Sequence, residues 1–399
     1  MGRSWLRWAA VGVFVLSTAL NYLDRQLLAS LAPTLKSEFQ LSNAQYGEIV
    51  SVFSIVYAAM APVAGWLVDR MGLTLVITFS MAVWSLAGVA TGLTRTFGGL
   101  LGCRTALGVG EAAGIPSSGK VNGLYLAPRE LALGTAVNQV GITIGSIAAP
   151  LIVAVMAPRY GWRWTFTVCG ALGFLWIPLW WITANNIPPG AEAPQPVRTA
   201  GIQAVLRDRR IWGLAIANML VMTLYTLWTN WTTIYFVQQH HLTEVQANRE
   251  FAWIPPIFAT LGGLFGGWLA YRAIRGGAGV LAARMRVCWT AGVLLLGTAA
   301  VPLMPSALLA AAAISASFFF CLSISTNLYA IPIDFFGVER AAFSVSILTC
   351  SYGLMQTFLS PLIGLMVDHL GFPAVCVAMS VLPLVGIAIL RATLRATRR

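Results

Sequence analysis

Twelve apolar runs of membrane-spanning length are the feature that most constrains the fold of this chain. A helix needs about 20 mostly apolar residues to cross a hydrocarbon core about 30 Å thick. Runs of that order follow one another at residues 8–32, 46–68, 74–93, 97–119, 131–157, 163–184, 211–237, 246–271, 281–303, 306–332, 341–367 and 372–390. Only 10% of the 399 residues are charged, against about 25% in soluble domains. The sequence therefore predicts an all-α, multi-pass membrane protein with twelve transmembrane helices.

The basic residues are distributed unevenly between the two sides of the predicted membrane. The chain carries 25 Lys and Arg against 13 Asp and Glu, a formal net charge of +12. With a cytoplasmic N-terminus, 17 of the 25 fall in inner segments; the others are Lys36, Arg95, Arg159, Arg163 and Arg249 in outer loops, and Arg25, Arg104 and Lys120 within spans. This bias follows the positive-inside rule and predicts that both termini are cytoplasmic. The basic excess therefore indicates membrane topology and no nucleic-acid partner.

The longest polar break separates six runs from the other six. It extends from Asn185 to Arg210, is rich in proline, and ends with Arg207-Asp208-Arg209-Arg210. We predict an N-terminal six-helix bundle at residues 1–184, a cytoplasmic linker at 185–209 and a C-terminal six-helix bundle at 210–399.

A short internal similarity indicates that the two halves are repeats. Ala149-Pro150-Leu151-Ile152, followed by Gly161, resembles Ser360-Pro361-Leu362-Ile363, followed by Gly371. Each stretch lies in the penultimate run of its half. Internal repeats of this kind are a common property of membrane transporters.

An acid and a base stand side by side inside the first run, in Asn21-Tyr22-Leu23-Asp24-Arg25. Each charge costs about 2.5–3.5 kcal/mol on insertion scales, and Asp24 is too short to reach an interface. Tyr22 and Arg25 share one helical face. The pattern predicts a partner helix or a water-filled cavity beside these residues. The alternative is a helix end with its charges at the headgroups.

A second pair of charges lies in the run 97–119. Arg104 and Glu111 are seven residues apart, nearly on one helical face and about 10.5 Å apart along the axis. Gly108 lies between them and leaves room for a close neighbour or a ligand. A buried carboxyl group can hold a proton, so Asp24 and Glu111 are candidate proton carriers, with Arg25 and Arg104 deciding which is ionised. A static ion-pair lattice that locks the helices is the alternative.

Other polar side chains at mid-span depth are less specific. Tyr57 and Gln139 either line a cavity or are satisfied core residues. The run 306–332 contains a polar cluster, in which Asn327 is the costliest to bury: Ser323, Ser325, Thr326 and Asn327. Serine and threonine often bond to their own helix backbone instead.

The run 211–237 carries an aromatic and amide set: Tyr225, Trp228, Asn230 and Trp231. Such a set suits stacking on a sugar-like ligand. Trp231 is equally suited to be an interfacial anchor.

The remaining chemistry points away from metals and enzymes. The six cysteines lie within predicted spans and do not have the spacing of metal ligands. We expect each of them to be buried and to pack as a small apolar residue: Cys103, Cys169, Cys288, Cys321, Cys350 and Cys376. The sequence contains no phosphate-binding glycine loop, no HExxH pattern and no nucleophile elbow. We predict no cofactor, no metal and no enzymatic activity.

The loop between the second and third runs carries the most specific motif, Gly65-Trp66-Leu67-Val68-Asp69-Arg70-Met71-Gly72. We expect Asp69 to cap the following helix and Arg70 to bridge to a neighbouring span, so that the loop holds an inner gate in one of its states. The pattern G-x-x-x-D-R-x-G resembles the signature loop of the major facilitator superfamily.

Further motifs narrow that resemblance. The opening Asn21-Tyr22-Leu23-Asp24-Arg25, the segment from Glu111 to Pro116, and Gly161-Trp162-Arg163-Trp164 resemble the anion:cation symporter family, which carries organic acids with protons. Within it, the pattern EAA-x-IP-xxx-K from Glu111 to Lys120 is similar to bacterial hexuronate transporters. The resemblance is strong from residue 21 to 170 and weak in the second half. In the second half the corresponding loop, Gly267 to Arg272, keeps only part of the motif, and Ile324 replaces a tryptophan found in some members.

The resemblance implies roles for individual residues. It implies proton coupling at Asp24 and Glu111, with Arg104 as the charge partner of the protonatable acid. It implies that Arg25 receives the substrate carboxylate. Further substrate contacts are implied at Tyr22, Tyr57, Gln139, Ser325, Thr326 and Asn327, and a gate motif at Gly65, Asp69, Arg70 and Gly72.

These observations together predict a proton-coupled symporter of the cytoplasmic membrane that imports an organic anion, most specifically a hexuronate or related sugar acid. Its partners would be that anion, protons and the lipid bilayer, and we expect a monomer. Within the class, the alternative is a carrier of an aldonate, an aromatic acid or a dicarboxylate. Outside it, the alternative is a membrane sensor with a transporter fold.

Overall fold

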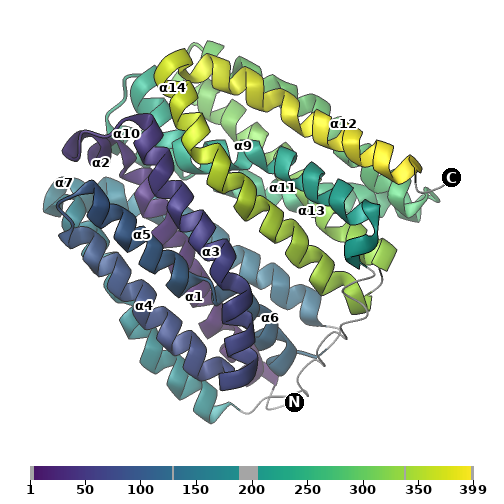
Figure 1. The fold of residues 1–399 in the computed structure, drawn as a ribbon, viewed down its shortest axis with the longest axis horizontal. Coiled ribbons are helices and arrows are strands. Elements are labelled where there is room, and N and C mark those ends of the chain that lie inside the picture. The colour runs from purple at the N-terminus through teal and green to yellow at the C-terminus, as the bar shows by residue number, and fades with distance from the viewer. Residues whose placement is uncertain (1–3, 128–129, 188–204, 337, 397–399) are drawn as a thin grey trace. The chain divides into compact units, whose positions relative to one another are not determined.

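The computed structural model describes residues 4–127, 130–187, 205–336 and 338–396 (Figure 1). These residues form helices joined by short connections, and no strand occurs among them. The chain divides into two compact units. The first unit comprises Met1–Leu41, Glu48–Gln195 and Leu242–Trp253, and the second comprises Ser42–Gly47, Pro196–His241 and Ile254–Arg399.

The first unit is built around two long helices that pack along each other. Helices α1 and α7 are in contact, and α4 packs against α7 and α5. The helices of this unit are α1 (Ser4–Ser30), α2 (Ala32–Glu38), most of α3 (Asn43–Met71), α4 (Leu73–Leu93), α5 (Phe97–Glu111), α6 (Gly114–Tyr125), α7 (Leu131–Asn186), α10 (Glu244–Gln246) and the π-helix η2 (Ala247–Ala252).

Aromatic side chains fill the core of the first unit. Phe14 packs edge-on against Trp180 with ring centroids 5.7 Å apart, and Trp176 stacks on Trp180 at 5.5 Å. The indole Nε1 of Trp176 donates a hydrogen bond to the carbonyl of Val13, 2.7 Å away. Burial of a large aromatic surface, with its polar atom satisfied, stabilises the contact between α1 and α7.

The second unit has the same kind of construction. Helix α14 packs against α9, and α13 packs against α11 and α12. Its helices are α9 (Arg209–Gln239), α11 (Pro255–Arg275), α12 (Val280–Leu295), the 3₁₀ helix η3 (Leu296–Leu303), α13 (Ala307–Phe336) and α14 (Val338–Ala396). Helix α9 begins where Asp208 accepts a hydrogen bond from the backbone N–H of Arg210. The side chain of Arg210 also holds the pKa of Asp208 below its usual range.

Nine helices in the described ranges are long and apolar enough to cross a membrane. Helices α7 and α14 have 56 and 59 residues, and each is interrupted by one glycine with non-helical geometry. Gly161 has a φ of 81° and Gly371 a φ of 75°, values that glycine adopts without steric cost. Figure 1 shows α14 reversing its direction. These are the two glycines that the sequence repeat aligns, so the similarity marks equivalent breaks in the two units.

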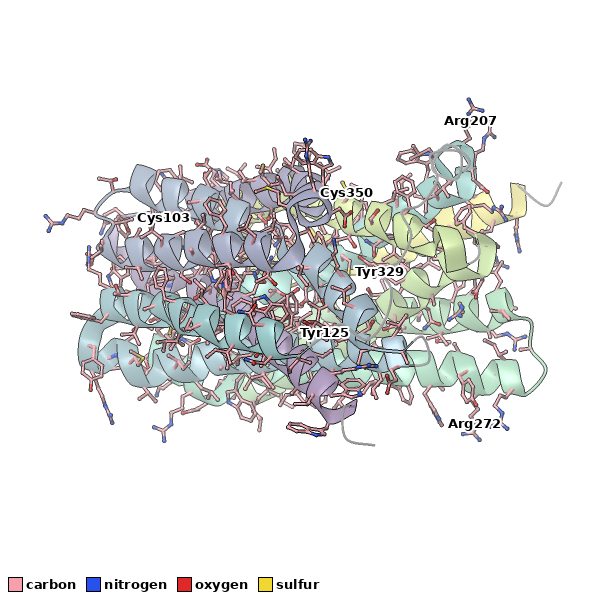
Figure 2. All side chains as sticks on the ribbon, turned by 90° about the horizontal axis from the view of Figure 1, so that it is seen from below. Cys103, Tyr125, Arg207, Arg272, Tyr329 and Cys350 are labelled. Atoms are coloured by element: carbon pink, nitrogen blue, oxygen red, sulfur yellow. The ribbon has the colours of Figure 1, made fainter. Side chains whose placement is uncertain are left out.

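Three sequence predictions concern the linker, the cysteines and the inner basic residues. Of the predicted linker 185–209, residues 188–204 lie outside the described residues. The prediction for the cysteines is wrong at Cys350, which is exposed, while Cys103 is partly buried and the other four are buried. Among basic residues predicted to be inner, Arg207 and Arg272 lie at the same end of the second unit (Figure 2).

Candidate functional site

Arg25 lies at the centre of a cluster of aromatic side chains within the first unit. Its guanidinium carbon lies 5.2 Å from the ring centre of Tyr22, 4.8 Å from that of Phe53 and 4.6 Å from that of Tyr57. Tyr22 precedes Arg25 by three residues on α1, and Phe53 and Tyr57 are one turn apart on α3. Ring faces attract a guanidinium group and exclude water from it. They therefore hold this cation inside an apolar helix bundle.

Glu111 supplies the negative charge of the cluster. It is the last residue of α5, and its Oε2 accepts a hydrogen bond from Nε of Arg25 at 2.6 Å. The Glu111 side chain is fully buried, whereas 23% of the Arg25 side chain remains exposed. We define the Arg25 cluster as Tyr22, Arg25, Phe53, Tyr57 and Glu111. Within the described residues no other acid pairs with Arg25, so the Nη end of its planar fork is not engaged by a carboxylate.

Asp24 faces a different neighbour from that of Arg25. Its Oδ2 accepts a hydrogen bond from the indole Nε1 of Trp84 on α4 at 2.5 Å. Asp24 is 5% exposed and Trp84 is 2% exposed. Arg104 is buried on α5 within electrostatic reach of both Asp24 and Glu111. Two carboxyl groups and two guanidinium groups are thus gathered in one part of the first unit, as the sequence predicts.

The structure adds one direct pair to the sequence prediction, and the role of Arg104 as charge partner remains a prediction. The resemblance implies that Arg25 is reserved for the substrate and that Arg104 partners the protonatable acid. In the structure the direct salt bridge of Glu111 is to Arg25. Arg104 and Glu111 share one helix, where seven residues separate them by about 10.5 Å along the axis. Arg25 reaches Glu111 from a second helix, and contacts between helices are not visible in the spacing along one of them.

Glycines allow α5 to approach its neighbours closely at this site. A Cβ atom on Gly108 would lie 3.0 Å from the carbonyl oxygen of Phe53, and one on Gly110 would lie 2.7 Å from the backbone nitrogen of Trp84. The expectation that Gly108 leaves room for a close neighbour is confirmed. The neighbour is the backbone of α3, which carries Phe53 and Tyr57 of the Arg25 cluster.

Replacing Gly110 with alanine should destabilise the protein by about 1–3 kcal/mol, because backbone atoms cannot move aside as a flexible side chain would. Gly102 is the matched control: it lies on the same helix, and a Cβ atom there meets nothing within 4 Å. The Gly102→Ala change should be neutral or mildly stabilising, since alanine favours helix over glycine. Thermal unfolding of both variants in detergent measures the difference. Equal melting temperatures would contradict the close packing of α5 on α4.

The polar cluster in the second unit has a packing role. Asn327 is fully buried, and its Nδ2 donates to the carbonyl of Gly266 on α11 at 3.1 Å and to that of Ser323 at 2.9 Å. Ser323 donates to the carbonyl of Gly262 at 2.7 Å. These bonds hold α13 against glycine positions on α11. Ser325 is buried and Thr326 is exposed on the same helix. Substrate contacts at Ser325, Thr326 and Asn327 remain a prediction.

Gln139 and the aromatic and amide residues of α9 are also predicted to contact a ligand. Gln139 is exposed on α7, and its side chain makes no hydrogen bond within the described part of the chain. Its substrate role also remains a prediction. The aromatic and amide set on α9 is mostly core: Trp228 and Trp231 are buried, and Trp231 packs edge-on against Tyr46 at 5.2 Å. Trp231 is therefore not an interfacial anchor.

The motif from Gly65 to Gly72 is predicted as a loop, but its residues up to Met71 are the end of helix α3, and Gly72 alone separates α3 from α4. Gly72 is the N-cap of α4, and no side chain caps that helix, so the capping role of Asp69 is wrong. Asp69 instead accepts a hydrogen bond from Nζ of Lys120 on α6 at 2.8 Å, and the same Nζ donates to the carbonyl of Val68 at 2.9 Å. The bridging role of Arg70 is also unsupported, because its guanidinium lies over Trp66 at 5.2 Å. Lys120 makes the bridge.

Replacing Lys120 with glutamine should slow transport while leaving substrate affinity within about twofold of wild type. The change removes the link between α6 and the end of α3, and the Asp69 side chain is 78% exposed. An exposed ion pair contributes only about 0–1 kcal/mol to stability, so the effect should appear in rate and not in folding. Initial uptake rates and equilibrium binding of labelled substrate measure the two quantities. The Arg70→Gln control removes a charge that forms no salt bridge within the described residues, and a larger loss in that variant would contradict the assignment.

Three contributors to these sites are missed by sequence reasoning. Trp84 holds Asp24, Phe53 covers Arg25, and Lys120 bridges to Asp69. Trp84 lies in the middle of its span, whereas most membrane tryptophans lie at the interfaces. That position is a usable signal for a buried hydrogen-bond donor. Lys120 carries a signal too, since a charge near a span end needs a partner.

An apolar helical bundle that encloses a cation, an acid and aromatic rings defines a multi-pass membrane protein with an ionic site inside its helices. The family model of the Major Facilitator Superfamily matches residues 14–327, and the chain belongs to that family of transporters, not to an enzyme family. The Hexuronate transporter of Escherichia coli (strain K12) is 29% identical over 401 residues, covering 96% of this chain and 92% of that protein. The Galacturonate transporter of Dickeya chrysanthemi is 29% identical over 283 residues, covering 66% and 81%.

A solved structure shares the fold. It is the crystal structure of a bacterial homologue of the human lysosomal transporter Spinster, with a TM-score of 0.84 and 19% sequence identity. It covers 98% of this chain and 97% of that chain. The match to the family model confirms the resemblance to the major facilitator superfamily inferred from the sequence, and this structure shows the same fold.

Proposed function

We propose that the protein is a proton-coupled symporter that imports a hexuronate, or a closely related sugar acid, across the cytoplasmic membrane by alternating access. The observation that carries this proposal is the Arg25 cluster, in which aromatic rings surround a guanidinium group whose Nη end contacts no acid among the described residues. A planar fork of this kind matches a carboxylate at two points. The names of the two transporters described above favour a sugar acid as the anion.

The topology that goes with this function has twelve crossings, with both termini in the cytoplasm. The breaks at Gly161 and Gly371 divide α7 and α14 into two crossings each, and α5 with α6 together make one more. The excess of basic residues in the predicted inner segments supports the orientation. We propose that it acts as a monomer with protons as its only coupling ion.

Proton binding and substrate binding are coupled because the carboxylate of Glu111 and the carboxylate of the substrate compete for the guanidinium of Arg25. When Glu111 is ionised, its carboxylate occupies the Nε side of the guanidinium at 2.6 Å. A proton on Glu111 removes that charge, so the positive charge of Arg25 becomes available to the substrate carboxylate. Proton binding therefore favours substrate binding, and binding of both shifts the equilibrium between outward-open and inward-open forms by differential affinity. Asp24 would act as a second proton carrier, while Tyr22 and Tyr57 would contact the sugar acid beside Arg25.

Uptake into proteoliposomes tests the proposal directly. The purified protein should accumulate labelled galacturonate or glucuronate when the outside is more acidic than the inside. A protonophore should abolish the accumulation but leave downhill entry. Neutral hexoses of the same size should not compete. If uptake is insensitive to the pH gradient, the coupling assignment fails. If neutral sugars enter as well as their acids, the role of Arg25 in carboxylate binding fails.

A further inference from the structure

We propose that a cavity between α12 and the end of α14 is a binding site for the headgroup of an anionic phospholipid. The cavity has a volume of about 540 Å³ and lies wholly within the second unit. Three arginines line it: Arg286 on α12, and Arg391 and Arg395 on α14. This site is separate from the Arg25 cluster, and the inference does not depend on which substrate is carried.

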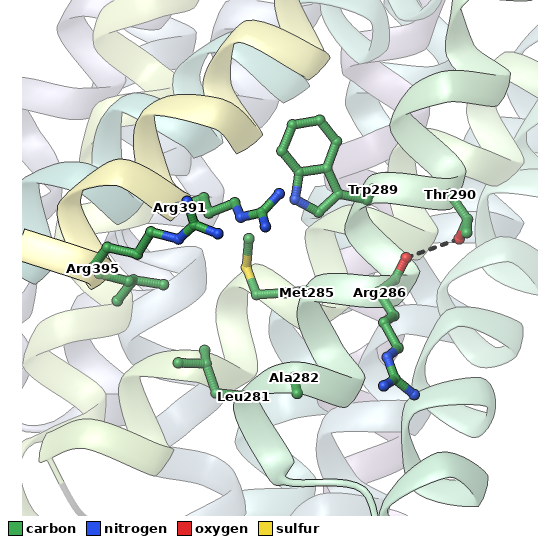
Figure 3. A pocket seen from close by; sticks show the side chains of 9 residues that line it. Leu281, Ala282, Met285, Arg286, Trp289, Thr290, Arg391 and Arg395 are labelled. Atoms are coloured by element: carbon green, nitrogen blue, oxygen red, sulfur yellow. Dashed lines mark hydrogen bonds between the residues drawn. The ribbon is translucent and has the colours of Figure 1, made fainter. Parts of the chain in front are cut away.

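The charge of the cavity is not balanced by the protein. No acidic residue lines it, and within the described residues none of the three arginines forms an ion pair. Arg391 and Arg395 are four residues apart on one helical face, where like charges repel. Arg391 and Arg395 reach from α14 toward α12, while Arg286 stands at the edge of the cavity with its guanidinium turned away (Figure 3). A bound anion would remove this repulsion.

Trp289 provides a second, independent observation. Its indole Nε1 is buried and has no hydrogen-bond partner among the described residues, although a buried donor without a partner is costly. The guanidinium of Arg391 lies 5.8 Å from the centre of the same ring. In Figure 3 the Trp289 ring lies opposite Arg391 and above Met285. An oxygen acceptor placed between Trp289 and Arg391 would satisfy the indole donor and the guanidinium together.

The other walls of the cavity point to a lipid and not to a soluble anion. Leu281, Met285 and Leu394 line it together with the arginines. Inorganic phosphate gains nothing from such a surface, whereas a phospholipid places its phosphate on the arginines and its glycerol and upper acyl carbons on the apolar wall. Basic pockets between helices at the cytoplasmic surface are suited to anionic headgroups. All three arginines belong to the segments predicted to be inner.

The equivalent part of the first unit lacks the arginines of this cavity. Both Gly161 and Gly371 are followed by helical residues to the end of the unit's last helix, and Trp181 lies 20 residues after Gly161 as Arg391 does after Gly371. Trp181 donates its Nε1 to Thr78 on α4 at 2.9 Å, and the last residues of α7, 179–186, carry no charge. The arginines of the cavity thus occur at only one of the two repeat positions within the described residues.

The test compares lipid binding to the full chain and to two double variants. Detergent-purified protein is mixed with equal amounts of dioleoyl phosphatidylglycerol and dioleoyl phosphatidylcholine, and bound lipids are counted by native mass spectrometry. Wild type should prefer phosphatidylglycerol. The Arg391→Gln/Arg395→Gln variant should lose about fivefold in that preference per arginine, roughly 25-fold in all. The Arg272→Gln/Arg275→Gln control removes the same charge from the end of α11, where each arginine contacts an aromatic ring, and should change the preference less than about twofold.

Two further experiments distinguish a specific lipid-binding site from nonspecific electrostatic attraction of anionic lipids. Trp289→Phe keeps the ring and removes the donor, so it should weaken phosphatidylglycerol binding several-fold without any change in charge. Millimolar inorganic phosphate should not displace the lipid. Equal losses in the two double variants, no preference in wild type, or displacement by phosphate alone would each overturn the proposal. A monodisperse elution profile is required of every variant, and Trp289→Phe supplies the test if the arginine variant does not fold.

Discussion

Replacing Arg25 with lysine should lower the affinity for a hexuronate by about 10- to 100-fold although the charge is kept. Arginine offers a planar fork that binds a carboxylate at two points, whereas an ammonium group binds as a single point. The loss of one hydrogen bond to a charged group costs about 1.5–3 kcal/mol, which corresponds to that range. Lysine would also lose the planar contact with the rings of Phe53 and Tyr57, which lie 4.8 and 4.6 Å from the guanidinium carbon.

Equilibrium binding of labelled galacturonate to detergent-purified protein measures this effect. Arg163→Lys is the matched control, because Arg163 also pairs with an acid, Glu38 at 2.8 Å, and also lies over a ring, that of Trp162 at 4.3 Å. That pair is exposed, and the same chemical change there should leave affinity unaltered. Near-wild-type affinity in the Arg25→Lys variant would place the carboxylate site elsewhere, and Arg104 would be the next candidate.

The helices are largely predictable from hydropathy, because the membrane requires long apolar segments. The runs 74–93 and 211–237 correspond closely to α4 (Leu73–Leu93) and α9 (Arg209–Gln239). Helix α2 (Ala32–Glu38) is missed because it is short and has no apolar run of its own. Each of the helices α7 and α14 contains two of the predicted membrane spans, joined at Gly161 and at Gly371, because helical hydrogen bonding continues directly on either side of each glycine.

The site is predictable in its residues but not in its contacts. Asp24, Arg25, Arg104 and Glu111 stand out because charge inside a span is costly. Which of them pair depends on how α1, α3, α4 and α5 pack, and no spacing along one helix contains that information. The bond from Trp84 to Asp24 and the salt bridge from Arg25 to Glu111 both join residues more than 50 positions apart.

Asn327 illustrates the opposite difficulty. An amide inside a membrane span suggests a ligand contact, because burying it without partners is costly. In the structure the carbonyls of Gly266 and Ser323 accept its two donor hydrogens. Glycine exposes backbone carbonyls to a neighbouring helix, so a buried amide opposite a glycine-rich helix has a packing explanation as well. The glycine pattern of α11, with Gly262, Gly263, Gly266 and Gly267, is the sequence signal for that explanation.

Replacing Glu111 with glutamine should abolish uphill uptake while leaving substrate binding and exchange. Glutamine keeps the size of a protonated glutamate and can still accept a hydrogen bond from Nε of Arg25, but it cannot release or take up a proton. The variant is therefore fixed in the state that resembles protonated Glu111, in which the charge of Arg25 is available to the substrate. Binding should persist and lose most of its dependence on pH. Labelled substrate should still exchange across the membrane, but it should no longer accumulate in response to a pH gradient.

Two companion variants make that result specific to Glu111. Glu38→Gln is the same chemical change in the exposed pair with Arg163, and it should leave accumulation intact. Asp24→Asn should behave differently from both, because the asparagine carbonyl can still accept the bond from Trp84 while the field beside Arg25 changes. It should alter affinity as well as coupling. If the Glu111→Gln protein still accumulates substrate in proportion to the pH gradient, Glu111 is a structural partner of Arg25, and Asp24 alone must carry the proton.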